Sequence, residues 1–478
     1  MISVSGKRDY KGQVIFLYED DSSYIPDEVL EARNISSTLE GKLYSVTNIY
    51  ISNKFYVIVG LGGYRNLNMK KLKSVVAKSV KQMKKAGIEE YGMDITPFIQ
   101  RFDSQCLFHL VEGIKLGNYE FYGYKTDKKE YDYTVFLQGI HKDINQIKEI
   151  IHKAENIVDG IIIARDLVNA PANRLTPELL SQEVILLGDK AGFEVEILKE
   201  DELEELNMKA FLTVGSSSGN SPRLIVMRYN GDSTSDKVAG LVGKGVTCDT
   251  GGYCLKASNT MGGIKGDMAG GAAVIGAIYG LAMNKVKTNV VGIIPACENR
   301  ISRESYIPGD VIDSMSGKTI EIINTDAEGR LILADAITYG IKVEGIDKVI
   351  DIATLTSAVV AALGFTTTGV LTNNTEFYDK LIKASEKSGQ QFWRFPIYDE
   401  YRDMLKSDIA DIKNMGKDYL GTVTAGLFIG SFAEKLPWIH MDIAGTAWVN
   451  PPIFQYQSEG ATGAPVTSLY FLFGMGDE

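Results

Sequence analysis

The segment NTDAEGRL (324–331) combines charged residues at a spacing that is typical of a cation site. Asp326 and Glu328 lie two residues apart, and Arg330 follows at the same interval. If the segment continues the apolar run 320–323 as an extended strand, the three side chains point the same way. Two adjacent carboxylates repel, and one takes up a proton unless a cation neutralises the pair. The spacing therefore favours a cation beside Asp326 and Glu328.

Two earlier glycine-rich segments add charged residues of the same kinds. Segment 241–256 (LVGKGVTCDTGGYCLK) contains Lys244, Asp249 and Lys256, and segment 264–274 (IKGDMAGGAAV) contains Asp267. Burying all of these charges unpaired would cost on the order of several kcal/mol each. Divalent cations would remove that cost, and four carboxylates are enough for two metals if one bridges. Oxygen-rich ligation suits Mg²⁺ or Mn²⁺, and Zn²⁺ also accepts it.

Each charged residue also has an ordinary structural explanation. Asp267 could cap a following helix, and Asp326 could belong to an Asx turn. Glu328 and Arg330 could form a surface ion pair. The glycines around Lys244 lack the spacing of a phosphate-binding loop. The number of such residues in loops between apolar strands favours a two-metal site, which can ionise a water and polarise a carbonyl or phosphoryl oxygen. Spacing alone leaves peptidase and phosphatase chemistry open.

Apolar segments of strand and helix length alternate from about residue 160 onward, and these elements must position the charged loops. The pattern predicts a central mixed, largely parallel sheet flanked by helices. Such sheets place their sites at the carboxyl ends of strands. The expected strands are 224–229, 238–242, 289–295, 320–323, 348–352 and 438–442, and the expected helices are 269–283, 331–341 and 424–434.

The first 150 residues resemble a smaller α/β domain. Strands are expected at 13–18 and 54–60, and a helix at 69–86. The polar face of this helix is rich in lysine, which is typical of a solvated face, with a polyanion contact as the alternative. A second helix, 145–168, ends in a turn cluster and carries the domain junction. We therefore expect an N-terminal α/β domain at 1–150, a linker helix at 151–170 and a larger domain at 171–478.

Composition limits the classes of protein to consider. The chain has 478 residues, which favours two domains, and its formal charge of −11 disfavours a mainly nucleic-acid-binding role. The first twenty residues lack the apolar core of a signal peptide, and the apolar run 269–283 suits a buried helix better than a membrane span. Four cysteines without a CxxC pair favour a reduced, cytoplasmic setting. Four histidines without an HExxH motif leave metal binding mainly to carboxylates.

These motifs together resemble the leucine (cytosol) aminopeptidase family of two-metal aminopeptidases. NTDAEGRL matches the family signature residue for residue, and segments 241–256 and 264–274 resemble its metal-binding stretches. Further similar stretches are ARDLVNAPANRLTP (164–177), PGDV (308–311), DIATLTSA (351–358) and GATGAPV (460–466). The likeness spans roughly 160–470, so it makes 171–478 the catalytic domain. For 1–150 it implies an oligomer-forming or regulatory role.

The resemblance implies a role for each charged position. One metal would be held by Lys244, Asp249, Asp267 and Glu328, and a more exchangeable one by Asp249, Asp326 and Glu328. The two metals would be Mn²⁺ or Zn²⁺, with Mg²⁺ as a further option. Lys256 and Arg330 would be the catalytic pair: Lys256 would stabilise the oxyanion, and Arg330 would hold a bicarbonate ion that acts as general base.

The resemblance also implies the reaction. A hydroxide that bridges the metals would attack the first peptide bond, releasing N-terminal residues from peptide substrates, with Leu- or Met-like residues preferred. The pocket for the first residue would be lined by Ile264, Thr354, Leu355 and Ser357. Two of these positions depart from the commoner pattern, since Ile264 stands where Met is frequent and Ser357 where Gly is usual. Cys248 and Thr250, beside Asp249, also depart from it; a redox or metal role for Cys248 and Cys254 is the alternative to small buried side chains.

Relatives in this family are hexamers, so a homohexamer is expected here. The main alternative function is a DNA-binding or architectural member with secondary peptidase activity, supported only by the lysine-rich helix 69–86. A catalytically inactive relative is a third option, but no metal or catalytic position is substituted.

Overall fold

A computed structural model describes residues 1–4, 10–20, 29, 39, 41–127, 131–140 and 143–474. The chain divides into two compact units. Unit 1 comprises 1–158 and 451–458, and unit 2 comprises 159–450 and 459–478. Helix α5 (Ile144–Asn169) contains the division between them. The predicted boundaries at 150 and 170 lie on either side of this division, and the segment predicted as catalytic, 171–478, includes residues 451–458 that pack with unit 1.

Unit 1 is built on a six-stranded sheet. The strand order is β1-β6-β5-β2-β4-β3, and every pair of neighbours is parallel except β3 and β4. The predicted strands at 13–18 and 54–60 are confirmed, and both are a little longer than expected. The bounds are β1 Ile2–Val4, β2 Gly12–Tyr18, β3 Val46–Ile51, β4 Lys54–Gly62, β5 Glu90–Asp94 and β6 Thr134–Gln138, with helices α2 Met69–Lys85, α3 Thr96–Phe102 and α4 Cys106–Asn118.

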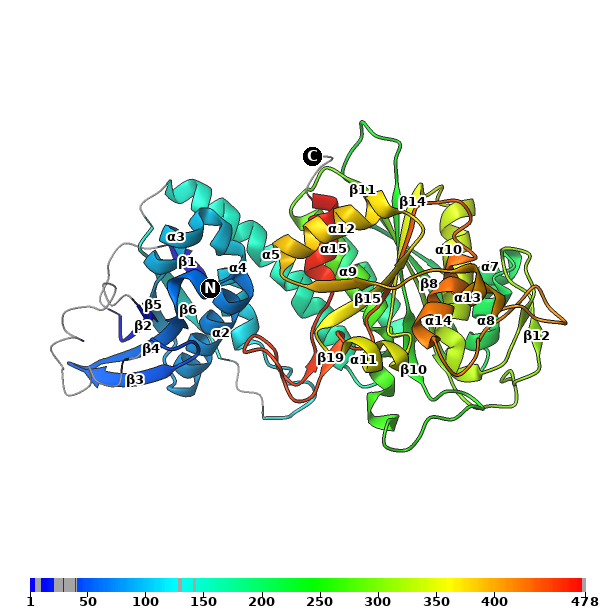
Figure 1. Cartoon of the computed structure of the whole chain (residues 1–478), viewed down its shortest axis with the longest axis horizontal. Helices are drawn as coiled ribbons and strands as arrows, with labels where there is room; N and C mark the ends of the chain where they lie inside the picture. Colours follow the sequence, from blue (N-terminus) through cyan, green and yellow to red (C-terminus); the bar gives the residue numbers. More distant parts are fainter. Residues whose placement is uncertain are drawn as a thin grey trace. The chain divides into compact units, whose positions relative to one another are not determined.

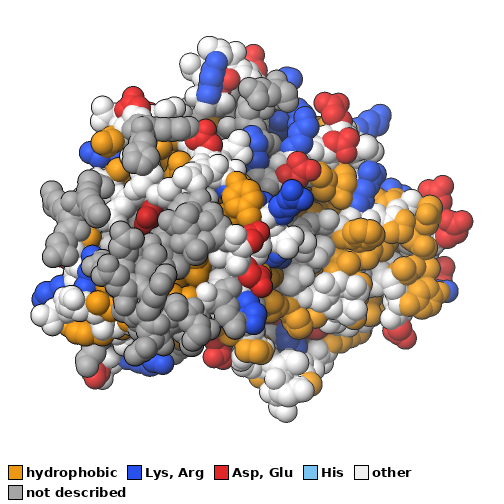
Figure 2. All heavy atoms as spheres, turned by 60° about the vertical axis from the view of Figure 1, so that its left-hand side comes forward, with side chains coloured by type: hydrophobic (Ala, Val, Ile, Leu, Met, Phe, Trp, Pro, Cys, Tyr) orange, Lys and Arg blue, Asp and Glu red, His pale blue; other side chains and the backbone are white. Residues whose placement is uncertain are grey.

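The lysine-rich helix α2 uses most of its lysines inside unit 1. Lys73 is buried and pairs with Glu112 at 3.1 Å, and Lys84 pairs with Glu120 at 3.1 Å. Lys70 and Lys73 lie over the rings of Phe454 and Tyr456 in the segment 451–458. These contacts leave few of the α2 lysines to face a polyanion. On the face of the molecule that Figure 2 shows, acidic and basic side chains are interspersed among the described residues, and these residues form no continuous basic surface.

Unit 2 contains the large sheet that positions the charged loops. Its strand order is β16-β15-β18-β14-β9-β11-β8-β7, with β10 also paired to β11. Five neighbouring pairs are parallel and three are antiparallel, as predicted for a mixed, largely parallel sheet. The bounds are β7 Glu194–Leu198, β8 Arg223–Asn230, β9 Ala239–Gly243, β10 Gly245–Asp249, β11 Asn289–Asn299, β14 Lys348–Ala353, β15 Thr367–Thr372, β16 Gln391–Arg394 and β18 Trp438–Asp442.

Helices cover both faces of this sheet (Figure 1). Strands β9, β10, β11 and β18 are buried along their whole length, and their polar residues, such as Asp249, Asn299 and Asp442, lie at or near the strand ends. Helices α9, α12 and α15 lie on one side, and α8, α10, α13 and α14 on the other. The helix bounds are α6 Pro177–Ala191, α7 Glu200–Glu205, α8 Lys209–Gly215, α9 Ala269–Met283, α10 Glu328–Lys342, α11 Ser357–Leu363, α12 Thr375–Ser388, α13 Asp399–Asp403, α14 Gly421–Gly430 and α15 Val466–Gly474.

Helix α9 confirms the prediction of a buried helix at 269–283. Residues Met261–Met283, which comprise α9 and the turns before it, are long and apolar enough to cross a membrane by length and composition alone. However, 83% of the 18-residue apolar window within this segment is buried inside the structure. Helix α14 begins and ends several residues earlier than predicted, and the strand expected at 320–323 is reduced to β13, Ile320–Glu321. β13 belongs to a separate three-stranded sheet with β12 (Val311–Ile312) and β17 (Ile412–Lys413).

Candidate metal centre and active site

The charged residues of the three motifs meet at the carboxyl edge of the large sheet. Lys244 connects β9 to β10, and Asp249 is the last residue of β10. Asp267 lies in the turn η4 (Met261–Met268) that precedes α9, and Glu328 is the first residue of α10. Each side chain therefore stands where a strand ends or a helix begins, which is the edge expected for a site in such a sheet.

Residues 326–330 are not extended. Asp326 lies in the short turn η5 (Thr325–Ala327), and α10 starts immediately after it. The side chain of Asn324 accepts a hydrogen bond from the Asp326 backbone N–H at 2.8 Å, so the Asx turn offered as an alternative is present. Asp326 and Glu328 still converge, because the carboxylate oxygens of Asp249, Asp326 and Glu328 lie within 4.8 Å of one another.

Two lysines hold the carboxylates in pairs. Lys244 Nζ lies 2.6 Å from Asp267 Oδ2 and 2.7 Å from Glu328 Oε1. Lys256 Nζ lies 2.7 Å from Asp249 Oδ2 and 2.5 Å from Asp326 Oδ1. Four carboxylates and two ammonium groups leave an excess negative charge in a largely buried site.

Neutral groups fix the carboxylates in place. Asn299 donates from Nδ2 to Asp249 Oδ1 at 2.9 Å and to the Thr325 carbonyl at 3.0 Å. Thr354 donates from its hydroxyl to Asp267 Oδ1 at 2.8 Å. Asp267 therefore does not cap α9, whose N-terminus has no side-chain cap. These contacts hold the acid side chains in one geometry before any cation arrives.

The pKa values of the acids show that burial and mutual repulsion disfavour their charged forms. Burial, together with the neighbouring Asp249 and Glu328, raises the pKa of Asp326 to about 6. Burial likewise raises the pKa of Asp249 and that of Asp267. Burial also acts to raise the pKa of Glu328, but the ammonium groups of Lys244 and Lys256 outweigh it and lower that pKa. The carboxylates are thus short of positive charge even with both lysines in place.

Gly329 allows the start of α10 to approach Lys244. A Cβ atom at this position would lie 2.5 Å from Lys244 Cε and 2.8 Å from its Nζ. Any larger residue would therefore push the amine away from Asp267 and Glu328. The glycine of the NTDAEGRL signature is needed here for close packing.

The donor set fits divalent cations. Asp267 Oδ2 and Glu328 Oε1 are buried and, among the described residues, accept no hydrogen bond, although both face Lys244 Nζ. Three converging carboxylates with further oxygen and nitrogen donors beside them form a site that suits Mn²⁺, Zn²⁺ or Mg²⁺. An amine binds a metal only in its neutral form, so a metal at Lys244 would displace its proton.

Arg330 lies behind the acids. It is 6% exposed, and its Nη1 donates to the Asn414 carbonyl at 2.7 Å. Burial lowers the pKa of Arg330 to about 10. Its Nε is buried and, within the described part of the chain, has no acceptor. Arg330 and Glu328 form no ion pair among the described residues, and both are buried, so the surface pair is excluded.

A cavity of about 370 Å³ opens beside the charged groups. Its lining includes all four residues predicted for the substrate pocket, which are Ile264, Thr354, Leu355 and Ser357. Lys244, Asp249, Lys256, Asp267 and Asp326 also line it, whereas Glu328 and Arg330 do not. The structure therefore brings the predicted pocket and most of the predicted metal ligands to one hollow.

Several residues of the site were not predicted from the sequence. Val168, Ala447 and Trp448 line the cavity, and Asn299 and Asn414 hold Asp249 and Arg330. None of them carries a charge, although Val168 lies in the stretch 164–177 that resembles the family. For Asn299 the available signal was position, since it is the last residue of β11 and thus lies at the same sheet edge as Asp249.

Family comparison agrees with this geometry along both units. Residues 162–470 match the catalytic-domain model of the cytosol aminopeptidase family, and residues 26–128 match its N-terminal-domain model. The chain belongs to the cytosol aminopeptidase family. A probable cytosol aminopeptidase of Clostridium perfringens (strain 13 / Type A) is 43% identical over 475 residues, covering 95% of each chain. One from Clostridium tetani (strain Massachusetts / E88) is 39% identical, covering 97% of each.

Solved structures show the same architecture. The bottromycin maturation enzyme BotP superposes with a TM-score of 0.88 at 27% identity, covering 98% of this chain and 99% of that one. Its complex with Mn gives a TM-score of 0.89, covering 98% and 100%. As a member of this family, the chain is a peptidase, and its acidic cluster is consistent with the divalent metals that the family uses.

Proposed function

We propose that this chain is a two-metal aminopeptidase that releases N-terminal residues from peptides. The observation that carries the proposal is the cluster of four carboxylates and two lysines beside a cavity lined by the predicted pocket residues. Lys244, Asp249, Asp267, Asp326 and Glu328 would hold the metals, with Asp249 and Glu328 bridging. The relative solved with Mn favours Mn²⁺, and Zn²⁺ fits the same donors.

The metals supply a Lewis acid and an activated water when they are bound. The chain's own residues supply the remaining functions. Lys256 lies beside Asp249 and Asp326, which would hold a metal, and its ammonium would stabilise the oxyanion that forms at the scissile carbonyl. Lys256 is part-exposed at the cavity wall, as this role requires.

Arg330 is proposed to hold a bicarbonate ion that acts as general base. Its buried Nε donor without a described acceptor supports an anion at this position. A guanidinium binds a planar oxyanion through two parallel hydrogen bonds, which fixes the orientation of the base.

The first side chain of the peptide would enter between Ile264, Leu355 and Trp448. These apolar groups line the same cavity as the acids, so the preference should be for Leu- or Met-like residues. Ser357 adds a hydroxyl at the same wall.

The experiment is hydrolysis of a leucine chromogenic amide by the purified protein. Activity should be lost on chelation and restored by Mn²⁺ or Zn²⁺. Lys406→Met, an exposed lysine of the same unit, is the control for any lysine substitution. Full activity in metal-stripped protein, or none with any metal, would overturn the proposal.

We also propose that the protein is a cytoplasmic homohexamer in which unit 1 has an oligomer-forming or regulatory role. The names of the curated relatives, which are cytosol aminopeptidases covered almost end to end by this chain, support the cytoplasmic setting. The hexamer and the role of unit 1 rest on membership of the family alone. Light scattering should give six times the chain mass of 52.5 kDa. A mass of one chain would refute the hexamer without affecting the peptidase assignment.

A further inference from the structure

A buried carboxylate outside the active-site cavity holds three of the residues that line it. Asp442 is the last residue of β18 and is 1% exposed. Its Oδ1 accepts hydrogen bonds from the backbone N–H groups of Leu355 and Ala444, both at 3.2 Å. Its Oδ2 accepts a hydrogen bond from the Thr356 hydroxyl at 2.6 Å. Leu355, Thr356 and Ala444 line the cavity, whereas Asp442 does not, so any effect of Asp442 on the reaction must pass through these neighbours.

The peptide unit between Thr354 and Leu355 links Asp442 to the metal centre. Its N–H belongs to Leu355 and donates to Asp442, and its C=O belongs to Thr354 and accepts from Lys244 Nζ at 3.2 Å. The N–H and C=O of a trans peptide lie in one plane and point in opposite directions, so a rotation of the unit disturbs both hydrogen bonds together. Thr354 also donates from its hydroxyl to Asp267 Oδ1 at 2.8 Å. Asp442 is therefore connected through one peptide unit to two of the proposed metal ligands.

The segment 354–356 is also anchored on the side of the helices. The Thr356 hydroxyl accepts a hydrogen bond from the Val359 N–H at 3.3 Å, which caps α11. The same hydroxyl lies 2.9 Å from the hydroxyl of Thr422, which is in the first turn of α14. The cavity wall is thus held between β18, α11 and α14, and Asp442 is the charged member of this network.

A carboxylate at this depth has an energetic cost. Burial raises the pKa of Asp442, although His440 and the three hydrogen-bond donors act against the rise. A carboxylate can accept all three hydrogen bonds at once, and its charge makes each of them stronger than a bond to a neutral acceptor. The charge therefore restricts the segment 354–356 to one conformation more firmly than a neutral side chain would.

We propose that Asp442 is a positioning residue of the active site, which orients the Lys244 amine and fixes the cavity wall formed by 354–356. The inference rests on the proposed function, because that function assigns Lys244 to a metal. A neutral amine binds a metal through its lone pair, and the acceptors of its two N–H groups set the direction of that lone pair.

The Thr354 carbonyl is the acceptor that can direct this amine when a metal is bound. Asp267 and Glu328 also contact Lys244 Nζ, but both would be metal ligands. Among the described residues this leaves the Thr354 carbonyl, whose direction is fixed from the far side of the peptide unit by Asp442. Loss of the Asp442 carboxylate should therefore weaken metal binding and loosen the pocket wall, although Asp442 contacts neither metal nor substrate.

The test measures the affinity of Asp442→Ala for Mn²⁺ and Zn²⁺ by competition with a chromogenic chelator in the absence of substrate. The affinity should fall by about 10–100-fold, as is typical when a group that orients a metal ligand is lost. The ratio of kcat/KM for a leucine amide to that for an alanine amide should also fall several-fold, because the pocket wall is less fixed. Asp442→Asn keeps an acceptor oxygen for the backbone N–H groups, and the Thr356 hydroxyl can accept from the new amide, so this variant should stay within about threefold of the wild type.

Asp335→Ala is the matched control. Asp335 is as buried as Asp442 and also accepts two backbone hydrogen bonds, from Phe211 and Met315, but it does not line the cavity. This variant should lose stability while keeping the metal affinity and the substrate preference of the wild type. The two alanine variants thus separate a positioning role from a general loss of core stability.

Thr356→Val serves as a second variant if Asp442→Ala does not fold. It removes the donor to Asp442 Oδ2 with little change in volume, and it should weaken metal binding a few-fold in the same direction. A wild type that neither binds metal nor hydrolyses the amides would contradict the proposed function, and this inference with it. An active wild type whose Asp442→Ala and Thr356→Val variants bind metal and select substrates as Asp335→Ala does would overturn the positioning role alone.

Discussion

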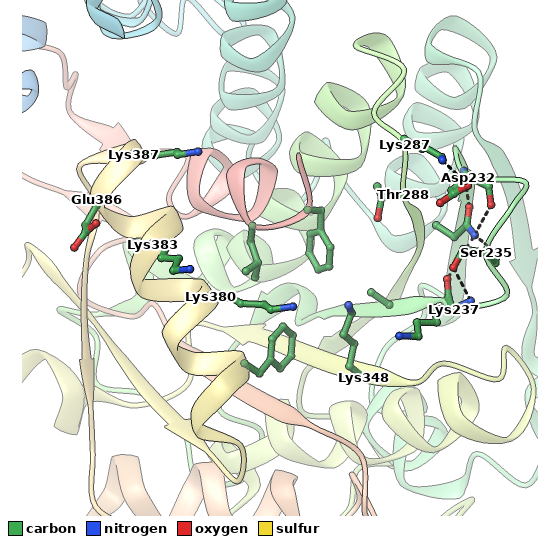
Figure 3. Close-up of a pocket in the computed structure, with 15 residues that line it drawn as sticks. Asp232, Ser235, Lys237, Lys287, Thr288, Lys348, Lys380, Lys383, Glu386 and Lys387 are labelled. Atoms are coloured by element: carbon green, nitrogen blue, oxygen red, sulfur yellow. Dashed lines mark hydrogen bonds and ion pairs between the residues drawn. The ribbon is translucent and has the colours of Figure 1, made fainter. Parts of the chain in front are cut away.

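The two cavities of unit 2 have opposite charge and opposite burial, although they use the same strands. At the carboxyl edge, four carboxylates are paired with two lysines in a largely buried site. At the amino edge, six lysines among the described residues line a second cavity (Figure 3), which we call the lysine pocket, and most of them are exposed to water; they are Lys237, Lys287, Lys348, Lys380, Lys383 and Lys387. A buried charge must be paired or bound to a cation, whereas an exposed ammonium keeps its hydration and costs little. The acidic site is therefore fixed by its pairs, whereas the exposed lysines of the lysine pocket keep their hydration.

Removing one acid from each cavity should give the largest difference in hydrolysis between the two cavities. Glu328→Gln removes a proposed bridging ligand and leaves Lys244 with one close carboxylate. We expect kcat/KM for a leucine amide to fall by about 10³-fold or more, with loss of bound metal. Glu386→Gln makes the same chemical change at the lysine pocket and should leave hydrolysis unchanged. Elemental analysis and kinetics check both, and equal activities would contradict the assignment of the acidic site.

Removing one lysine from each cavity should give the next largest difference. Lys256→Met should lower kcat by roughly 10²–10³-fold with little change in KM, because its ammonium acts on the transition state. Lys383→Met removes an ammonium from the lysine pocket and should not change kcat. A Lys256→Met enzyme that loses metal affinity instead of kcat would show that this lysine only positions the acids.

Glycine substitution tests whether close packing sets the acidic site. Gly329→Ala would place a Cβ 2.5 Å from Lys244 Cε, so the amine must move. Overpacking of this kind destabilises by about 1–3 kcal/mol, and we expect activity to fall by roughly tenfold or more. Gly262→Ala has open space around the new methyl group and serves as control. Chemical denaturation and kinetics on both variants check the expectation; equal stabilities would mean that Lys244 adjusts freely.

A buried acid held by backbone N–H groups gives the smallest effect on hydrolysis and isolates the role of burial. Asp335 in α10 is fully buried, and it accepts backbone hydrogen bonds from Phe211 at 3.0 Å and Met315 at 2.8 Å. Burial raises its pKa to about 7, although the backbone donors act against the rise. The folded state therefore binds more protons than the unfolded state above about pH 4, so this contribution to stability is lost as pH rises through 7.

The measurement compares the free energy of unfolding of wild type and Asp335→Asn between pH 5 and 8. As the pH rises from 5 to 8, the free energy of unfolding of the wild type should fall by about 1–3 kcal/mol relative to that of the variant, whose side chain does not titrate. Titration of the metal-site acids is common to both proteins and cancels in the difference. The exposed Asp313→Asn should show no such trend, and a pH-independent difference at Asp335 would mean that its backbone donors outweigh burial.

Long uniform elements could be predicted from the sequence. Helix α9 occupies the predicted residues 269–283, and β18 the predicted residues 438–442, because each is a mainly apolar segment that is buried in the core. The short strand β10 was missed, since glycine and charged residues interrupt its apolar pattern. The sequence left the conformation of 326–330 open between a strand and an Asx turn, and the turn forms because the Asn324 side chain accepts a hydrogen bond from the backbone N–H of Asp326.

The sequence by itself determined the chemical inventory: four acids, two lysines and an arginine in glycine-rich loops, and a family in which they do metal-dependent chemistry. Only the tertiary structure decided which amine faces which acid. It also decided that Arg330 does not line the active-site cavity, and that six of the described lysines line a second cavity. The reason is the order of the sheet. β9 lies between β14 and β11, so residues far apart in the chain become neighbours at both ends of the same strands, and no local spacing encodes that order.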